Sequence, residues 1–323
     1  MTIKSFTYAR PKTLEEAVSL LARPGARAHA GGTDLLGCLR DEVFEAKEVV
    51  SLSLLTEMKG ISVEQGRLRI GALTTLAHVA EDKAVTSRYR TLGEGAASAA
   101  SPQLRNQGTL GGNLCQRPRC WYFRGEFPCL RKGGETCYAV DGENQYHALF
   151  GGSSCFIVHP SDTASPLVAL EARFRLVGPK GARTVEAESF FTLPDADVQK
   201  ENVLGPGEIL TEVLLPAPVT GLKSTYRKVR SRGSWDFALA GAAVVLVMAG
   251  GKVKKARVVL SGAAPIPWRA RKAEEALVGK ALNLAVIKAA AQASAFGAEP
   301  MSGNAAKIEL VKGAVEEALR SLV

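Results

Sequence analysis

The sequence predicts an α+β fold in which antiparallel hairpins outnumber parallel strand pairs. Residues 61–72, 172–185 and 240–262 each alternate as two short strands around a Gly-containing turn, a pattern typical of a hairpin. Helical periodicity is found near both ends of the chain, at 13–21 and from residue 268 onward. This mixture favours an α+β fold over a doubly wound parallel sheet.

The first helix is predicted at Thr13 to Leu21. Thr13 and Glu16 form a T-x-x-E capping box, and Pro24 with Gly25 ends the helix. The elements expected after it are a short strand at 26–30, a Gly-rich turn and helix start at 30–37, a strand at 49–52, the 61–72 hairpin turning at Gln65 and Gly66, and a short helix at 74–82.

The second half of the chain begins with the 172–185 hairpin, which turns at Gly-Pro-Lys-Gly. A strand follows at Glu208 to Pro216, and the segment APVTGLK after it is a plausible boundary. The 240–262 hairpin turns at Gly250 and Gly251. We therefore expect two domains, residues 1–217 and a smaller α+β domain at 218–323 made of an antiparallel sheet and helices.

Composition excludes several classes of protein. Apolar residues make up 46% of the 323 residues and charged residues 23%, which is near the globular average. The N-terminus has no signal-peptide pattern and no apolar run is long enough for a membrane span. The net charge of +9 comes from scattered Lys and Arg, so we expect no nucleic-acid partner. The default location is cytoplasmic, and export within a complex stays possible because a partner chain can carry the signal.

Two glycine-rich turns are the first candidate site. AGGTDLLG spans Ala30 to Gly37 and GTLGGN spans Gly108 to Asn113. Adjacent glycines allow a tight turn whose successive N–H groups point at one place, and a helix start adds a positive dipole end. Either turn alone is more often structural. Together they favour a ligand with two phosphates.

Five ordered motifs over essentially the whole chain resemble one family. They are AGGTDLL, LRNQGTLGGNL, HPSDTASPLVAL, KVRSRGSWDFALAGAAV and LSGAAPIPWRARKAEEAL. In this order they are similar to the FAD-binding medium subunit of the molybdenum hydroxylases, a group that includes xanthine dehydrogenases, carbon monoxide dehydrogenase, aldehyde oxidoreductases and 4-hydroxybenzoyl-CoA reductase. The resemblance implies a two-part FAD-binding domain of the vanillyl-alcohol-oxidase (PCMH) type, followed by the smaller C-terminal domain.

The resemblance also implies the residues that bind FAD. Both glycine-rich turns would hold the pyrophosphate and neighbouring groups, Asp162 would accept hydrogen bonds from the cofactor, and Lys228 would lie near the flavin ring. Without the family, Asp162 is an ordinary helix cap and Lys228 an ordinary surface lysine. The full implied set is Ala28, His29, Ala30, Gly31, Gly32, Thr33, Asp34, Leu35, Leu36, Ser101, Thr109, Gly111, Gly112, Asn113, Asp162 and Lys228.

Cysteines cluster in the segment that joins the second turn to the HPSDT motif. The spacing of Cys120, Cys129, Cys137 and Cys155 matches neither a zinc ribbon nor a bacterial ferredoxin. In most of the family this link is much shorter, so residues 116–156 resemble an insertion, and a loop of this length needs something to hold it.

A subset of the family, similar to 4-hydroxybenzoyl-CoA reductase and the bacterial three-subunit aldehyde oxidoreductases, carries a 4Fe-4S cluster in such an insertion. The resemblance implies Cys120, Cys129, Cys137 and Cys155 as its ligands. Cys115 is the main rival because it directly follows the second turn. A zinc ion and a loop with incidental thiols remain alternatives.

Five cations lie in the same segment: Arg117, Arg119, Arg124, Arg131 and Lys132. If they lie beside the cluster, they would stabilise its reduced state; otherwise they are solvated loop charges. His147 is a further candidate ligand, although a lone His in an aromatic stretch is more often structural.

The function expected from the resemblance is an oxidoreductase subunit that transfers electrons through FAD. A large molybdopterin subunit would carry out the substrate chemistry, a small 2Fe-2S subunit would relay electrons, and an external acceptor or donor would exchange them with FAD. The chain itself offers no catalytic constellation for substrate chemistry. A self-sufficient flavin oxidoreductase and a four-cysteine zinc module serving assembly are the alternatives.

Overall fold

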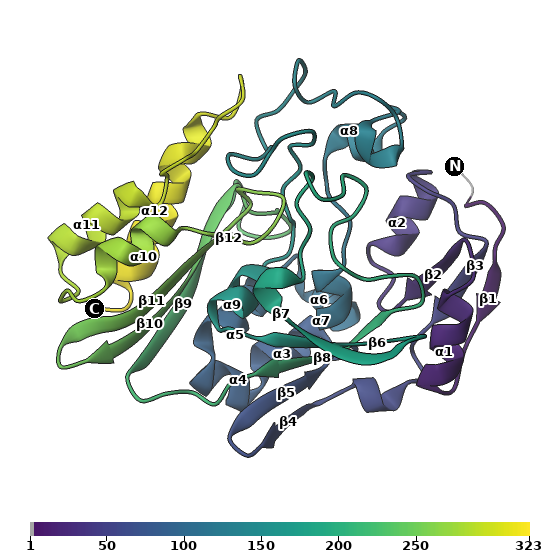
Figure 1. Ribbon diagram of the computed structural model, residues 1–323, viewed down its shortest axis with the longest axis horizontal. Helices are drawn as coiled ribbons and strands as arrows, with labels where there is room; N and C mark the ends of the chain where they lie inside the picture. The colour runs from purple at the N-terminus through teal and green to yellow at the C-terminus, as the bar shows by residue number, and fades with distance from the viewer. Residues whose placement is uncertain (1–2) are drawn as a thin grey trace.

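The computed structural model describes residues 3–323, which form three sheets with helices packed between and beside them (Figure 1). A small parallel sheet stands at the N-terminal side, with strand order β1-β3-β2. Its elements are β1 (Thr7–Ala9), α1 (Leu14–Leu21), β2 (Ala26–His29), α2 (Leu35–Arg40) and β3 (Glu48–Ser51). The helices α1 and α2 connect the strands, and such crossovers are what allow neighbouring strands to run parallel.

One of the two hydrogen bonds of the predicted capping box at the start of α1 is confirmed. The Oγ1 atom of Thr13 accepts a hydrogen bond from the N–H of Glu16 at 3.2 Å, as a capping residue does. The carboxylate of Glu16 does not reach back to Thr13, and it accepts instead from the N–H of Lys12 at 2.9 Å. The first bond satisfies an N–H group that the helix itself leaves free, and the second ties the helix to the residue before its cap.

A five-stranded antiparallel sheet forms the centre of the molecule, with strand order β4-β5-β8-β6-β7. The predicted hairpins are confirmed as β4 (Ile61–Glu64) with β5 (Arg67–Gly71), and β6 (Arg173–Gly178) with β7 (Gly181–Glu186). The strand β8 (Ile209–Leu215) joins them by pairing with β5 on one side and β6 on the other.

Short helices fill the chain between β5 and β6. They are α3 (Leu76–Glu81), α4 (Lys83–Arg88), α5 (Arg90–Ser98), α6 (Pro102–Gln107), α7 (Leu110–Leu114), α8 (Trp121–Arg124) and α9 (Ala164–Ala169), with the 3-10 turn η2 (Leu130–Lys132) between α8 and α9. Two further 3-10 turns, η1 (Thr56–Met58) and η3 (Ala187–Ser189), lie outside this stretch. The α9 helix is buried along its length, so it belongs to the core.

The C-terminal part is a four-stranded antiparallel sheet covered by three helices, at the left of Figure 1. Its elements are β9 (Leu222–Val229), β10 (Ala240–Ala249), β11 (Lys252–Ser261), β12 (Trp268–Arg269), α10 (Arg271–Leu277), α11 (Leu284–Ala293) and α12 (Ala306–Arg320). On β10, Val244 packs into the core beneath these helices, whereas Val245 packs into the core of the N-terminal part. Both faces of this sheet are therefore buried.

The cysteine-bearing segment, residues 116–156, has little regular structure apart from α8 and η2. It lies at the top of Figure 1, between the parallel sheet and the C-terminal part. Asn304 donates to the carbonyls of His147 and Ala148, and the buried ammonium of Lys307 donates to the carbonyls of His147 and Gly262. The C-terminal part thereby holds this segment in place.

The helices in residues 3–323 are all too short or too polar to cross a lipid bilayer.

Candidate functional site

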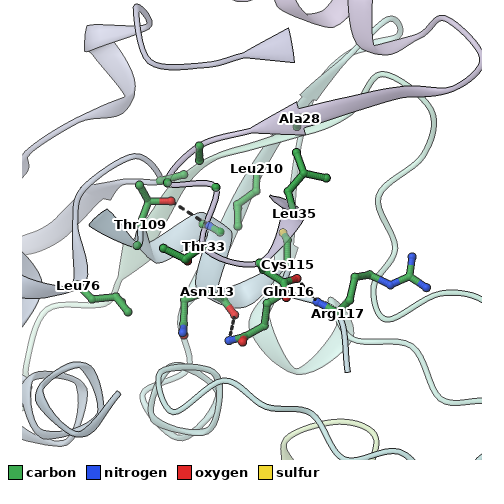
Figure 2. A pocket seen from close by; sticks show the side chains of 18 of the residues that line it. Ala28, Thr33, Leu35, Leu76, Thr109, Asn113, Cys115, Gln116, Arg117 and Leu210 are labelled. Carbon is green, nitrogen blue, oxygen red and sulfur yellow. Dashed lines mark hydrogen bonds between the residues drawn. The ribbon is translucent and has the colours of Figure 1, made fainter. Parts of the chain in front are cut away.

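A cavity of about 350 Å³ opens between the parallel sheet, the short helices α6 and α7, and the start of the cysteine-bearing segment (Figure 2). Both glycine-rich turns lie on its wall. Gly31 stands where a Cβ atom would lie 2.2 Å from the carbonyl oxygen of Gln107. Only glycine allows the two turns to approach this closely.

The first turn presents free backbone donors. Within residues 3–323, the N–H groups of residues 31–35 have no protein acceptor. Gly32 has a φ of +74°, a conformation that favours glycine. Five consecutive free N–H groups beside a cavity suit an anion such as a pyrophosphate, which agrees with the prediction for this turn.

The second turn differs from the first, so the prediction that both turns present backbone donors is wrong for it. Leu110 and Gly111 donate their N–H groups to the carbonyls of Thr74 and Ala72, both at 2.8 Å. The N–H of Gly112 donates to Oγ1 of Thr109 at 3.1 Å (Figure 2). This turn is bound to the chain beside β5 and offers side chains to the cavity instead.

Asn113 supplies one of these side chains. Its Oδ1 atom accepts hydrogen bonds from the hydroxyls of Ser161 and Thr163, at 2.6 and 2.8 Å. Since the oxygen is occupied, the amide NH2 is the group left to donate. The carbonyl of Asn113 accepts from Gln116 at 2.8 Å (Figure 2). The HPSDT motif therefore orients the second turn.

Asp34 joins the first turn to the cysteine-bearing segment. Its carboxylate accepts from the backbone N–H of Arg117 and from the guanidinium of Arg124, each at 2.8 Å, and pairs with Arg119 at 2.8 Å. Arg119 also stacks over the ring of Phe237 at 4.8 Å. The turn and this segment are therefore held as one unit on the cavity wall.

Asp162 lines the cavity and belongs to a buried hydrogen-bond network. Lys228 donates to one carboxylate oxygen and Tyr226 to the other, both at 2.8 Å. Burial raises the pKa of Asp162, although the charge of Lys228 acts against that rise. Burial also raises the pKa of Tyr226 well above its usual value, and the charge of Asp162 adds to this. The Tyr226 hydroxyl is consequently a fixed donor.

Most of the predicted cofactor-binding residues line this cavity: Ala28, Ala30, Gly31, Gly32, Thr33, Asp34, Leu35, Thr109, Gly111, Gly112, Asn113 and Asp162. Four lie outside its wall. The ring of His29 lies behind Gly32, Leu36 is exposed, Ser101 caps α6 by accepting from Leu104, and Lys228 lies behind Asp162.

The sequence reasoning missed several residues of the site. Gln116, Arg117, Arg119 and Phe237 all line the cavity, and Tyr226 completes the Asp162 network. Phe237 stands inside a quoted motif, and Tyr226 alternates with Lys228 on β9, so both could have been singled out. The sequence predicts Arg117 and Arg119 only as cations near the proposed cluster, and not as residues of the cavity.

Four of the six thiols form a group. The charges of Cys129 and Cys155 raise the pKa values of both Cys120 and Cys137, so all four lie within electrostatic reach of one another. Burial is the larger cause and raises the pKa of Cys120 to about 11. Nearby backbone N–H groups act against this rise in both Cys120 and Cys137. In addition, Nε2 of His147 lies 3.3 Å from the sulfur of Cys120.

The other two thiols differ in position, and Cys38 packs in one apolar cluster with Cys129 and Cys120. Cys115 is on the wall of the cavity, where burial raises the pKa of its thiol to about 12 and the charge of Glu201 adds to the rise. Cys38 is buried on α2, and its sulfur accepts from Arg124 at 2.9 Å. In the described chain, no three or more His, Cys, Asp or Glu side chains lie as ligands of one metal ion would.

Comparison with protein families identifies the fold. The family description "FAD binding domain in molybdopterin dehydrogenase" matches residues 4–218, and "CO dehydrogenase flavoprotein C-terminal domain" matches residues 224–321. The chain therefore belongs to the FAD-binding subunits of this family, and it is an oxidoreductase subunit that binds FAD.

Relatives with known names agree with this assignment. The chain is 38% identical over 280 residues to the aldehyde oxidoreductase FAD-binding subunit PaoB of Escherichia coli K12, covering 85% of this chain and 86% of that one. It is 30% identical over 298 residues to the carbon monoxide dehydrogenase medium chain of Hydrogenophaga pseudoflava, covering 91% and 88%. A solved structure of carbon monoxide dehydrogenase from that organism superposes with a TM-score of 0.80 at 30% identity, over 100% of this chain and 98% of that one.

Proposed function

We propose that the chain is an electron-transfer flavin subunit whose cysteine-bearing segment holds a 4Fe-4S cluster. Its partners would be a large molybdopterin subunit, where substrate reacts, and a small 2Fe-2S subunit. The names of relatives support a multi-subunit assembly, since they are called FAD-binding subunit or medium chain. The observation that carries the proposal is that one segment, residues 116–156, contains the four cysteines and also contributes Gln116, Arg117 and Arg119 to the wall of the cavity.

In this proposal the first turn binds the FAD pyrophosphate through the free N–H groups of residues 31–35. Thr109 and Asn113 add side chains from the second turn. The Asp162 network contributes fixed charge on the cavity wall, where Lys228 holds the carboxylate and Tyr226 donates to it. When bound, FAD supplies the conversion between one-electron and two-electron transfer. The protein's part is to bind and orient it.

The thiol group fits an iron–sulfur cluster in its donor chemistry. Four thiolates are the usual ligands of a 4Fe-4S cluster, and backbone N–H groups directed at the sulfurs adjust its potential. Since each thiolate binds a separate iron, the ligands stand further apart than those of one zinc ion, whose Zn–S bonds of about 2.3 Å bring four sulfurs into contact.

Cys115 is better explained as part of the FAD cavity than as a ligand. It lines that cavity, and the charge of Glu201 adds to the rise in its pKa that burial causes. We therefore keep Cys120, Cys129, Cys137 and Cys155 as the ligand set.

The test is the visible spectrum and metal content of the purified chain. Flavin bands with a broad absorption that bleaches with dithionite, together with iron, are expected. A colourless protein containing zinc would contradict both the flavin and cluster assignments, and turnover of a small substrate by the isolated chain would favour a self-sufficient enzyme.

Single Cys→Ala variants test the ligand set. Cys120→Ala, Cys129→Ala, Cys137→Ala and Cys155→Ala should each lose iron and keep FAD. Cys115→Ala is the matched control, because it removes a thiol next to the same segment and should keep iron. Iron loss in Cys115→Ala with retention in the other four would overturn the assignment.

A further inference from the structure

Two residues of the C-terminal sheet hold the Asp162 carboxylate from one side. Lys228 and Tyr226 both belong to β9, two positions apart and therefore on the same face of that strand. Lys228 donates to Oδ2 of Asp162 and Tyr226 to Oδ1, both at 2.8 Å. Each carboxylate oxygen has a further lone pair. Since both donors stand on the β9 side, the remaining lone pairs are available on the other side, where Asp162 lines the cavity.

The neighbours of Asp162 in the chain are bound to the second glycine-rich turn. The hydroxyls of Ser161 and Thr163 donate to Oδ1 of Asn113 at 2.6 and 2.8 Å. The three residues 161–163 thus join that turn to the C-terminal sheet, and Asp162 is the one of them that lines the cavity. Its backbone is fixed from the turn and its side chain from the sheet.

Tyr226 is itself held by a second hydroxyl. Its oxygen lies 2.8 Å from Oγ of Ser261 on β11, and both side chains are buried. An ionised carboxylate can only accept hydrogen bonds, so Tyr226 gives its O–H to Asp162 and Ser261 donates to Tyr226. The two hydroxyls therefore form a chain of hydrogen bonds that ends on Asp162.

Gly241 makes room for this chain of hydrogen bonds. It belongs to β10, which lies between β9 and β11 (Figure 1), and it pairs with Ser261 in the sheet. A Cβ atom on Gly241 would lie 2.4 Å from Oγ of Ser261 and 3.2 Å from Oη of Tyr226. Any side chain here would push the two hydroxyls away from their present positions. Glycine on the middle strand thus allows Tyr226 to reach Ser261.

We propose that Tyr226 and Ser261 are positioning residues for FAD, which fix the Asp162 carboxylate so that its free lone pairs accept a hydrogen bond from the N–H of the flavin ring. The inference rests on the proposed contact between Asp162 and the cofactor and is independent of the iron–sulfur cluster. The oxidised flavin ring has one N–H donor, and a fixed, ionised acceptor makes a strong hydrogen bond with it. Neither Tyr226 nor Ser261 lines the cavity, so both act through Asp162.

The test compares the binding of FAD with that of ADP, which has the adenosine and pyrophosphate of FAD but no flavin ring. The full-length chain is depleted of flavin, and both dissociation constants are measured by isothermal titration calorimetry. Tyr226→Phe should raise the dissociation constant of FAD about tenfold, because a hydrogen bond to a charged group is lost. The constant for ADP should stay unchanged. Ser261→Ala, which acts one hydrogen bond further away, should raise the constant for FAD about threefold.

Tyr89→Phe is the matched control. It also removes a buried hydroxyl, which donates to the carbonyl of Pro216 at 2.6 Å, and it should bind FAD and ADP as the wild type does. A double-variant cycle then tests whether Tyr226 acts through Asp162. Asp162→Asn should weaken FAD binding by itself, and Tyr226→Phe added to it should weaken binding no further. Independent effects of the two changes would contradict the proposed role.

The possible results separate the cofactor site from the role of Tyr226. A wild-type chain that binds no FAD would overturn the site, and this inference with it. Normal FAD binding by the wild type together with an unchanged constant in Tyr226→Phe would overturn only the positioning role. Equal weakening of FAD and ADP would show a general loosening of the structure and would overturn it as well. If Tyr226→Phe does not fold, Ser261→Ala decides alone, and an unchanged FAD constant there contradicts the proposal.

Discussion

Gly31 shows how one absent methyl group permits the approach of the two glycine-rich turns. A Cβ atom there would lie 2.2 Å from the Gln107 carbonyl oxygen. A Cβ atom on Gly37, which lies in α2, would meet nothing within 4 Å. The two glycines stand in the same sequence motif, AGGTDLLG. Only the packing of α6 against the first turn distinguishes them.

We therefore expect Gly31→Ala to weaken FAD binding at least tenfold, or by about 1.4 kcal/mol, because the turn must move away from Gln107. Gly37→Ala is the control, and should stabilise α2 by about 0.5–1 kcal/mol while FAD binding stays as it was. Flavin fluorescence on dilution measures both affinities. Equal binding by the two variants would show that the close approach does not matter.

His159, in the HPSDT motif, is buried beside Phe191 with its rings 4.7 Å apart. Burial lowers its pKa from 6.5 to about 4. The unfolded chain therefore takes up a proton below pH 6.5 while the folded chain does not. The stability associated with the neutral ring is complete above pH 6.5 and is lost as the pH falls toward 4.

This shift predicts that the free energy of unfolding falls by about 2 kcal/mol between pH 7 and pH 5 on account of His159. His159→Asn should lack that part of the pH dependence. His78→Asn, which changes an exposed histidine, should retain it. Urea unfolding at several pH values provides the comparison, and parallel pH profiles for wild type and His159→Asn would refute the prediction.

At the scale of elements, two strained residues meet beside the cavity. Ala100 follows α5 with a φ of +44°, and Trp235 in the loop before β10 has a φ of +73°. The N–H of Trp235 donates to the carbonyl of Ala100 at 3.1 Å. This bond fixes the loop that carries Phe237 to the cavity, and the strain is offset by packing elsewhere.

Ala100→Gly should accordingly raise the free energy of unfolding by about 1 kcal/mol, since glycine adopts positive φ without a penalty. The matched substitution Ala97→Gly, at an exposed position inside α5, should lower it by about 0.5–1 kcal/mol. Denaturant unfolding measures both. If the two changes have the same sign, backbone strain at Ala100 is not the controlling factor.

At the scale of the whole molecule, the C-terminal sheet lies between two cores. Val244 packs beneath the three C-terminal helices and Val245 packs against the N-terminal part. A strand buried on both faces is a continuous apolar run, and AGAAVVLVMA is such a run. The core of the N-terminal part thus extends across the expected boundary at residue 217.

Val244→Ala and Val245→Ala should therefore each destabilise the protein by about 2 kcal/mol, from lost burial and the cavity left behind. Val219→Ala, at a side chain that is 55% exposed, should change stability by less than about 0.5 kcal/mol. Thermal unfolding with calorimetry is the measurement. If Val245→Ala leaves the thermal stability unchanged, the two parts of the chain pack less closely than described.

Local patterns were sufficient for much of the fold. The hairpins, α1 with its Thr13 cap, and the helical C-terminus follow from periodicity and turn residues that act over a few positions. The parallel sheet was not foreseen, because β1, β2 and β3 are paired through crossovers and no short-range signal states which strands become neighbours. The pairing of β5 with β8 spans more than a hundred residues and was hidden for the same reason.

The sequence by itself determined the family, the two glycine-rich turns, and the thiols available as ligands, because each depends on residue type and order along the chain. Tertiary structure decided which turn has free N–H groups, which cysteine lines the cavity, and which of five cations is buried. Those distinctions depend on hydrogen-bond partners and burial. Both are supplied by segments as distant as Glu201 from Arg131, which are brought together only when the chain folds.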